Sequence, residues 1–120
     1  MRTMALAVGL GGWLLVSVLA HAQGPAPQAF RVEWSRRTDP WLRPGVDGYV
    51  HNDSNYRVGN VLLRVQVVDG SERVLSERSA WVIGNIVARG RGHFSLPVLA
   101  DGQTYRIAVK SWDLISIEAP

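Results

Sequence analysis

The sequence predicts an all-β domain, built as an antiparallel sandwich of two sheets with about six to seven strands. Two observations predict it. Apolar residues recur at every second position through most of the chain after residue 23, and Gly, Asp, Asn and Pro clusters separate these stretches. No window after residue 23 has a helical period, and the connections are too short for helical crossovers. A small closed barrel is the alternative architecture.

The expected strands follow one another along residues 30–34, 46–52, 58–68, 73–83, 92–98 and 104–116. Asp69-Gly70 predicts a hairpin between the third and fourth strands, because both residues tolerate the positive φ of tight turns. Gly48, inside the second strand, predicts a bulge or a close backbone approach. In the third strand, Leu63, Val65 and Val67 share a face and Val68 lies on the other.

The first 22 residues have the pattern of a secretory signal peptide. Arg2 precedes an apolar run from Met4 to Ala20, and Ala20-His21-Ala22 is a small-residue cleavage site. We therefore expect cleavage after Ala22 and a periplasmic or secreted protein, with no stable membrane span left after cleavage. The alternative is an uncleaved N-terminal membrane anchor, although the run is shorter than the ~20 residues of a spanning helix.

Cleavage leaves enough chain for one domain. We expect a linker over residues 23–29 and the sandwich over residues 30–118. The sequence has no cysteine, which excludes disulfides, thiolate metal sites and a lipid-modified cysteine. Its 13 basic and 10 acidic residues alternate in sign, as in Glu72-Arg73 and Glu77-Arg78, rather than forming a basic stripe. This pattern disfavours a nucleic-acid partner.

Several strand and turn motifs resemble the FxLYD-type and related immunoglobulin-like domains of exported bacterial proteins. They are Val46-Asp47-Gly48-Tyr49-Val50-His51-Asn52, the long apolar strand ending in Asp69-Gly70, the turn Gly90-Arg91-Gly92 before Phe94, and Tyr105-Arg106-Ile107-Ala108-Val109. The resemblance covers residues 46–113. It implies an immunoglobulin-like sandwich with an accessory or interaction role and no catalytic residues.

Three candidate chemical sites favour a structural interpretation. His51-Asn52-Asp53-Ser54 places a triad's residue types too close together for a nucleophile, histidine and acid to align, so we expect strand-end and turn hydrogen bonds there. His51 and His93, with scattered carboxylates, do not form a metal-ligand pattern. Gly84 and Gly90-Arg91-Gly92 precede no helix that would hold a phosphate, which predicts turn geometry. We expect neither catalytic residues nor a cofactor or metal.

The connection from Ser35 to Gly45 is the candidate binding site, with Arg36, Arg37, Trp41 and Arg43 as its residues. Trp and Arg dominate interface energetics, and Asp39-Pro40 and Pro44-Gly45 would stiffen the loop. The alternative is that Trp41 and Leu42 plug an open end of the sandwich while the arginines are solvated.

We therefore expect an exported, non-catalytic accessory module whose partner is a protein of the cell envelope. An anionic glycan or lipid surface is a second class of partner. The alternative function is glycan binding by exposed tryptophans, if two of them lie side by side on a sheet. Trp34, Trp81 and Trp112 lie in alternating strands, which favours core or edge packing for them.

Overall fold

The computed structural model describes residues 24–118, so the predicted signal peptide and its cleavage site lie outside the described residues. Six strands follow a short 3-10 turn: η1 (Pro27–Ala29), β1 (Phe30–Arg36), β2 (Val46–Asn52), β3 (Tyr56–Val68), β4 (Val74–Trp81), β5 (Arg91–Leu96) and β6 (Thr104–Ile117). The six predicted strands are therefore present, and β2 has the predicted bounds.

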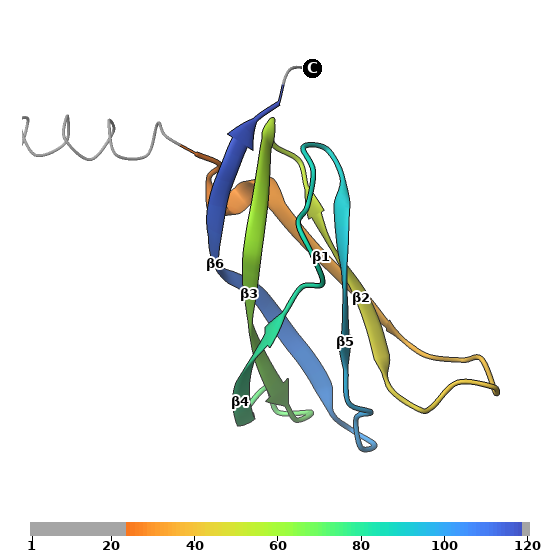
Figure 1. The fold of residues 1–120 in the computed structure, drawn as a ribbon. Coiled ribbons are helices and arrows are strands. Elements are labelled where there is room, and N and C mark those ends of the chain that lie inside the picture. The colour runs from red at the N-terminus through yellow and green to blue at the C-terminus, as the bar shows by residue number, and fades with distance from the viewer. Residues whose placement is uncertain (1–23, 119–120) are drawn as a thin grey trace, which may run out of the picture.

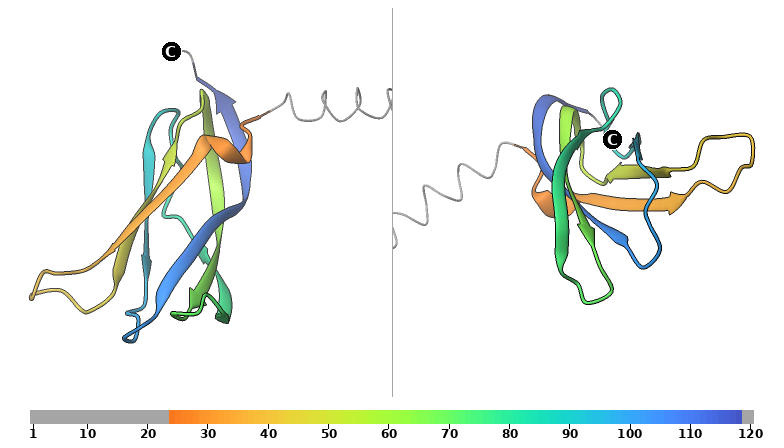
Figure 2. Two further views of the ribbon diagram at one scale, coloured as in Figure 1. Left: turned by 180° about the vertical axis from the view of Figure 1, so that it is seen from behind. Right: turned by 90° about the horizontal axis from the view of Figure 1, so that it is seen from below.

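The strands form two antiparallel three-stranded sheets, which confirms the predicted two-sheet sandwich (Figure 1). Sheet A has the order β1-β2-β5, and sheet B has the order β4-β3-β6. The β1–β2 loop stands apart from both sheets, at the end of the molecule opposite to η1 and the end of β6 (Figures 1 and 2).

Period-two alternation builds the core between the sheets. In β2, Val46, Val50 and Asn52 are buried and the residues between them are partly exposed, apart from the buried Gly48. Val61, Leu63 and Val65 of β3 face them from sheet B, fully buried. Two aromatic pairs close the side where β1 lies near β6: Phe30 with Trp112, at 4.7 Å between ring centroids, and Trp34 with Tyr105, at 5.7 Å.

Gly48 is a point of close approach and not a bulge. It pairs with Trp34 on one side and Phe94 on the other without a break in register. A Cβ at this position would overlap the Phe94 ring and would lie 2.7 Å from the carbonyl oxygen of Glu33. The missing side chain is the space in which the Phe94 ring packs.

The predicted β3–β4 hairpin is present, but the residue with a positive φ is not one of the two that the sequence indicated. Asp69 accepts hydrogen bonds on Oδ1 from the backbone N–H groups of Ser71 (2.9 Å) and Arg73 (3.0 Å). These bonds wrap the turn around the aspartate, and the left-handed backbone falls on Glu72 (φ 62°) instead of Asp69 or Gly70. The turn is therefore longer than a two-residue Asp-Gly turn.

Strands β3 and β6 pair irregularly. The register shifts between Arg57 and Val58, between Gly59 and Leu62, and between Leu62 and Leu63. A further irregularity in the β3–β4 pairing lies opposite Val67 and Val68, where Leu75 of β4 is the extra residue. The sequence pattern placed Val67 and Val68 on opposite faces, and in the structure Val68 is buried while Val67 is partly buried and packs against the core.

Candidate functional site

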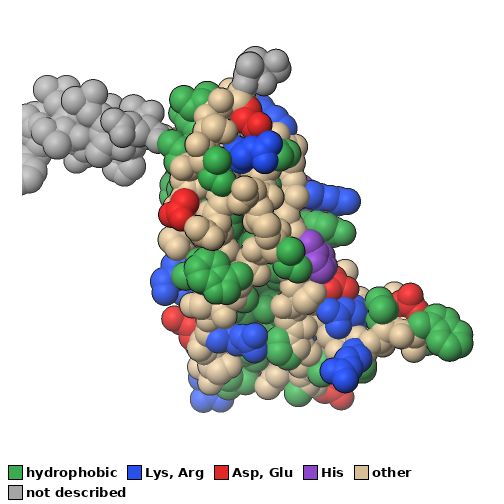
Figure 3. Space-filling model, in the orientation of Figure 1, with side chains coloured by type: hydrophobic (Ala, Val, Ile, Leu, Met, Phe, Trp, Pro, Cys, Tyr) green, Lys and Arg blue, Asp and Glu red, His purple; other side chains and the backbone are tan. Residues whose placement is uncertain are grey.

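The loop between β1 and β2 projects from the sandwich into solvent, and residues 38–44 are all exposed. The backbone N–H of Arg37 donates to the carbonyl of Gly45 (2.9 Å), which closes the base of the loop. Beyond that bond the chain projects away from the sandwich (Figure 2), and Figure 3 shows a hydrophobic side chain at its outer end with charged side chains of both signs behind it.

The tip of the loop is an ordered β-turn. Leu42 donates its backbone N–H to the carbonyl of Asp39 (3.1 Å), and the N–H of Trp41 donates to Asp39 Oδ1 (2.9 Å). Pro40 occupies the second position of the turn, where its fixed φ suits this geometry. The side chains that follow it point outward, with 91% of Trp41 and 55% of Leu42 exposed.

Arg37 anchors the loop to sheet A. Its Nε and Nη2 donate to the two carboxylate oxygens of Asp47, at 2.8 and 3.0 Å, and its Nη1 donates to the carbonyl of Arg43 (3.1 Å). Gly45 lies directly beneath the guanidinium, because a Cβ there would be 2.6 Å from Nη1. The paired fork raises the pKa of Arg37 and lowers that of Asp47 to about 2.

Asp47 also joins the loop to the neighbouring strand β5. Oδ1 accepts a hydrogen bond from Ser95 Oγ (3.0 Å) and lies 3.3 Å from His93 Nε2. The carboxylate thus sits between the serine and the histidine. A nucleophile needs the reverse order, with the histidine in contact with the hydroxyl, so this trio does not activate Ser95. It ties the base of the loop to two strands.

The four predicted binding residues divide into two pairs. Arg36 donates to the carbonyls of Leu99 (3.5 Å) and Gln103 (3.4 Å), and Arg37 is held by Asp47, so both arginines bind the body of the protein. Trp41 and Arg43 are exposed further along the loop, and Arg36 is exposed at its base. The alternative in which Trp41 plugs the sandwich is wrong, because the turn carries this side chain away from the sheets.

The outer face of sheet A carries a polar network that the sequence reasoning missed. His51 bonds the carboxylate of Glu33, which lowers the pKa of that carboxyl. The Arg91 guanidinium lies 4.0 Å from the centroid of the Tyr49 ring. Beside these pairs is a shallow recess of about 180 Å³, lined by Glu33, Trp34, Ser35, Asp47, Gly48 and Tyr49. The signal was present in the sequence, since the residues alternating with the apolar positions of β1, β2 and β5 are polar or aromatic.

The segment from His51 to Ser54 has the structural role that the sequence predicted. Asn52 is fully buried, and its Nδ2 donates to the carbonyls of Tyr56 (2.7 Å) and Val87 (3.2 Å). Its Oδ1 accepts from the backbone N–H (3.1 Å) and the hydroxyl (2.6 Å) of Ser54. Asp53 pairs with Arg31, which lowers the pKa of Asp53.

The two histidines do not converge. His51 lies opposite Arg91, and His93 lies opposite Tyr49, so they occupy diagonal positions and contact different carboxylates. Within residues 24–118, no three His, Cys, Asp or Glu side chains are arranged to hold a metal ion. At the glycine positions, Gly84 has the positive φ of a turn (71°), and Gly92 packs against Val82 and Ile86.

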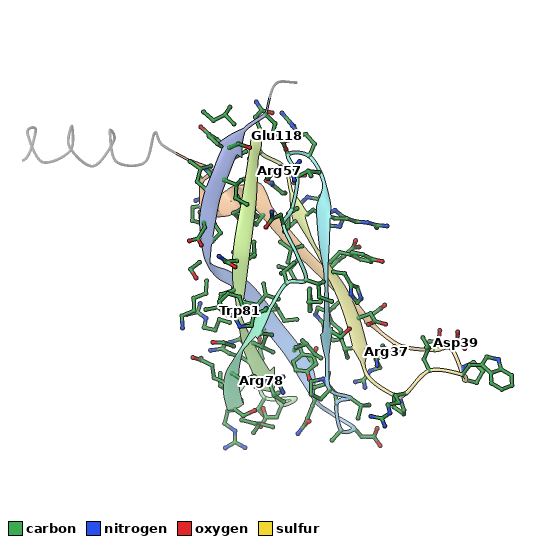
Figure 4. The ribbon with its side chains drawn as sticks, viewed as in Figure 1. Arg37, Asp39, Arg57, Arg78, Trp81 and Glu118 are labelled. Atoms are coloured by element: carbon green, nitrogen blue, oxygen red, sulfur yellow. The ribbon has the colours of Figure 1, made fainter. Side chains whose placement is uncertain are left out.

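The tryptophans within the described residues lie in two different environments. Trp34 and Trp112 pack against the core, whereas Trp41 and Trp81 are exposed, Trp81 to 62%. Figure 4 shows Trp81 on β4, far from the turn at Asp39 that carries Trp41. The two exposed indoles therefore do not form the side-by-side pair that the glycan alternative requires.

Comparison of the chain with protein-family models, curated proteins and solved structures gives no match. The resemblance to FxLYD-type and immunoglobulin-like domains thus stays a prediction from the motifs of residues 46–113. In the part of the chain that the structure describes, no helix has the length and apolar character needed to cross a membrane.

Proposed function

We propose that this protein is an exported, non-catalytic interaction module that docks a protein partner of the cell envelope through the turn at Trp41. Its leader is removed after Ala22, and the sandwich acts as the scaffold that presents the β1–β2 loop. The single observation that carries the proposal is a tryptophan with 91% of its surface in solvent, held on an ordered turn.

The order of the turn matters because binding is weakened by the entropy of immobilising a flexible loop. Here the Asp39 bonds fix the tip, and the Arg37–Asp47 fork fixes the base. Trp41 is therefore presented in one place before any partner arrives. Tryptophan is also the residue most enriched among the energetic centres of protein interfaces.

The charges around the tip favour a protein over a lipid surface. Asp39 and Arg43 are both exposed, one on each side of the Trp41–Leu42 pair. An anionic membrane attracts clusters of basic residues, and an acidic side chain beside the inserting tryptophan opposes that attraction. Mixed charges around an apolar centre are instead the usual composition of a protein-binding patch and its polar rim.

Site-specific photo-crosslinking in living cells tests the proposal. A photoreactive amino acid replaces Leu42, which leaves Trp41 in place, and the matched control carries it at Leu75 of β4, which is similarly exposed (55% and 51%). We expect a reproducible protein adduct from position 42 that position 75 does not give. The adduct should weaken when Trp41→Ala is added. No adduct at position 42, or the same set of adducts from both positions, contradicts the proposal.

The export step has its own measurement. N-terminal sequencing of the protein recovered from the periplasmic fraction or the medium should begin at Gln23. Recovery of the full chain with the membrane fraction would instead support the anchored alternative.

A further inference from the structure

The outer face of sheet B holds a second exposed surface, separate from the Trp41 loop. Residues opposite each other in an antiparallel pair point to the same face. Leu63 and Val65 point into the core, so Leu62, Arg64 and Gln66 point outward with their neighbours. Three rows cross this face: Trp81, Leu62 and Ser111; Ser79, Arg64 and Ala108; Glu77, Gln66 and Arg106.

Trp81 is exposed because the alternation of β4 sends its neighbours inward. Ala80 packs against the core and Val82 is buried, which leaves the indole on the opposite side of the sheet. Trp81 is the last residue of the edge strand β4, and it lies opposite Leu62 of β3. Figure 4 shows the indole on β4, and 62% of its surface is exposed.

The charges near Trp81 are basic. Arg64 lies in the next row, between Ser79 and Ala108, and Lys110 lies in the β-bulge beside Ser111. Both are exposed, and no ion pair within residues 24–118 involves either of them. The acidic residues around this face have partners of their own. Glu77 accepts a hydrogen bond from Gln66 (2.8 Å) one row further away, Asp113 accepts one from Asn60 (2.8 Å), and Glu72 pairs with Arg106 (3.8 Å).

We infer that this face binds an acidic glycan, with Trp81 stacking on a sugar ring and Arg64 and Lys110 pairing with its carboxylates. The apolar face of a pyranose packs on an indole, and guanidinium groups bind carboxylates with paired hydrogen bonds. Small neighbours at Ser79, Ala108 and Ser111 leave the two cations accessible. This site is independent of the Trp41 loop, so each proposal stands or fails alone.

Binding of polygalacturonate oligomers, followed by tryptophan emission, tests the inference. Dextran is the neutral sugar control, and polyglutamate is the acidic control without sugar rings. We expect the oligomers to bind more tightly than either control, with a shift in emission. Trp81→Ala and Arg64→Gln should each weaken binding roughly tenfold. Trp81→Phe should recover part of the loss because it keeps an aromatic face.

Trp41→Ala is the matched control, since it removes the other exposed indole and should leave the affinity for polygalacturonate unchanged. Trp81 and Arg64 lie outside the core, and the melting temperature of each variant shows that it is folded. The inference is overturned if polygalacturonate does not bind, if polyglutamate binds equally well, or if Trp81→Ala binds like the wild type. Equal binding of dextran would also overturn it, because the basic residues would then have no role.

Discussion

Arg37 and Asp47 are joined by two parallel hydrogen bonds, of 2.8 and 3.0 Å, between the base of the projecting loop and the outer face of sheet A. A bidentate pair fixes direction as well as distance. This geometry gives Arg37 a structural role beside the binding role predicted for it, since its bonds to Asp47 and to the Arg43 carbonyl hold the base of the loop that carries Trp41.

Replacing Arg37 with glutamine should loosen the loop without unfolding the domain. The N–H groups of Trp41 and Leu42 should exchange with deuterium about tenfold faster, because the base of the loop would open more often. The control is Arg57→Gln, which removes the pair with Glu118 at the other end of the sandwich. That variant should leave the exchange of the two loop amides unchanged. Unchanged exchange in Arg37→Gln would show that the hydrogen bonds of Asp39 are enough to keep the turn closed.

Acid should weaken the fold through Asp47. The pKa of its carboxyl falls from an ordinary 3.8 to about 2 in the folded protein, chiefly because Arg37 binds the charged form. The stabilisation from this depressed pKa is complete above the ordinary value and is lost as the pH falls towards 2. Denaturant titrations should therefore show the free energy of unfolding decreasing between about pH 4 and pH 2.

The variant Asp47→Asn should show a shallower decrease over the same range. Some decrease will remain, because Arg31 lowers the pKa of Asp53 and the Ala88 N–H lowers that of Glu118. Asp101→Asn, at an exposed turn, serves as the control and should keep the wild-type slope. A slope in Asp47→Asn equal to that of the wild type would remove Asp47 from the acid response.

Gly48→Ala should destabilise the protein by about 2 to 3 kcal/mol in urea unfolding, because the new methyl group would overlap the Phe94 ring. Gly70→Ala is a suitable control, since a Cβ there meets nothing within 4 Å. Its stability should stay within about 0.5 kcal/mol of the wild type. Equal effects of the two substitutions would mean that the ring moves aside.

Asn52→Ala should cost about 2 kcal/mol in the same assay, because it leaves the carbonyls of Tyr56 and Val87 without their amide donor. Asn85→Ala changes an exposed asparagine and should have little effect. A small loss in Asn52→Ala would indicate that water replaces the amide.

The strands were predictable because their signal is local. Alternation of apolar residues at every second position located all six, and for β2 it also gave the bounds that the structure shows. In β4 both sets contain apolar residues, so the sequence could not decide that Ala80 and Val82 point inward while Leu75 and Trp81 point out. That choice depends on the opposing sheet.

The features that the sequence did not predict depend on contacts between residues that are distant in the sequence. The exposure of the Trp41 side chain follows from the turn at Asp39 and from the direction in which the loop leaves the sheet. The structural role of Arg37 depends on its contact with Asp47 of the next strand, and the polar network of sheet A depends on the strand order β1-β2-β5. Neither can be read from the sequence alone. At Glu72, the side-chain bonds of Asp69 determined which residue adopted the left-handed backbone.

The irregular pairing of β6 has a consequence for how the molecule behaves in a crowded solution. Strand β6 is long and forms one edge of sheet B, and straight edges invite neighbouring chains to add strands and aggregate. Its pairing with β3 is regular from Thr104 to Val109, and register shifts interrupt the pairing from there to Ile117. A second molecule would find a regular template along only part of this edge, which disfavours the addition of a strand along the rest of it.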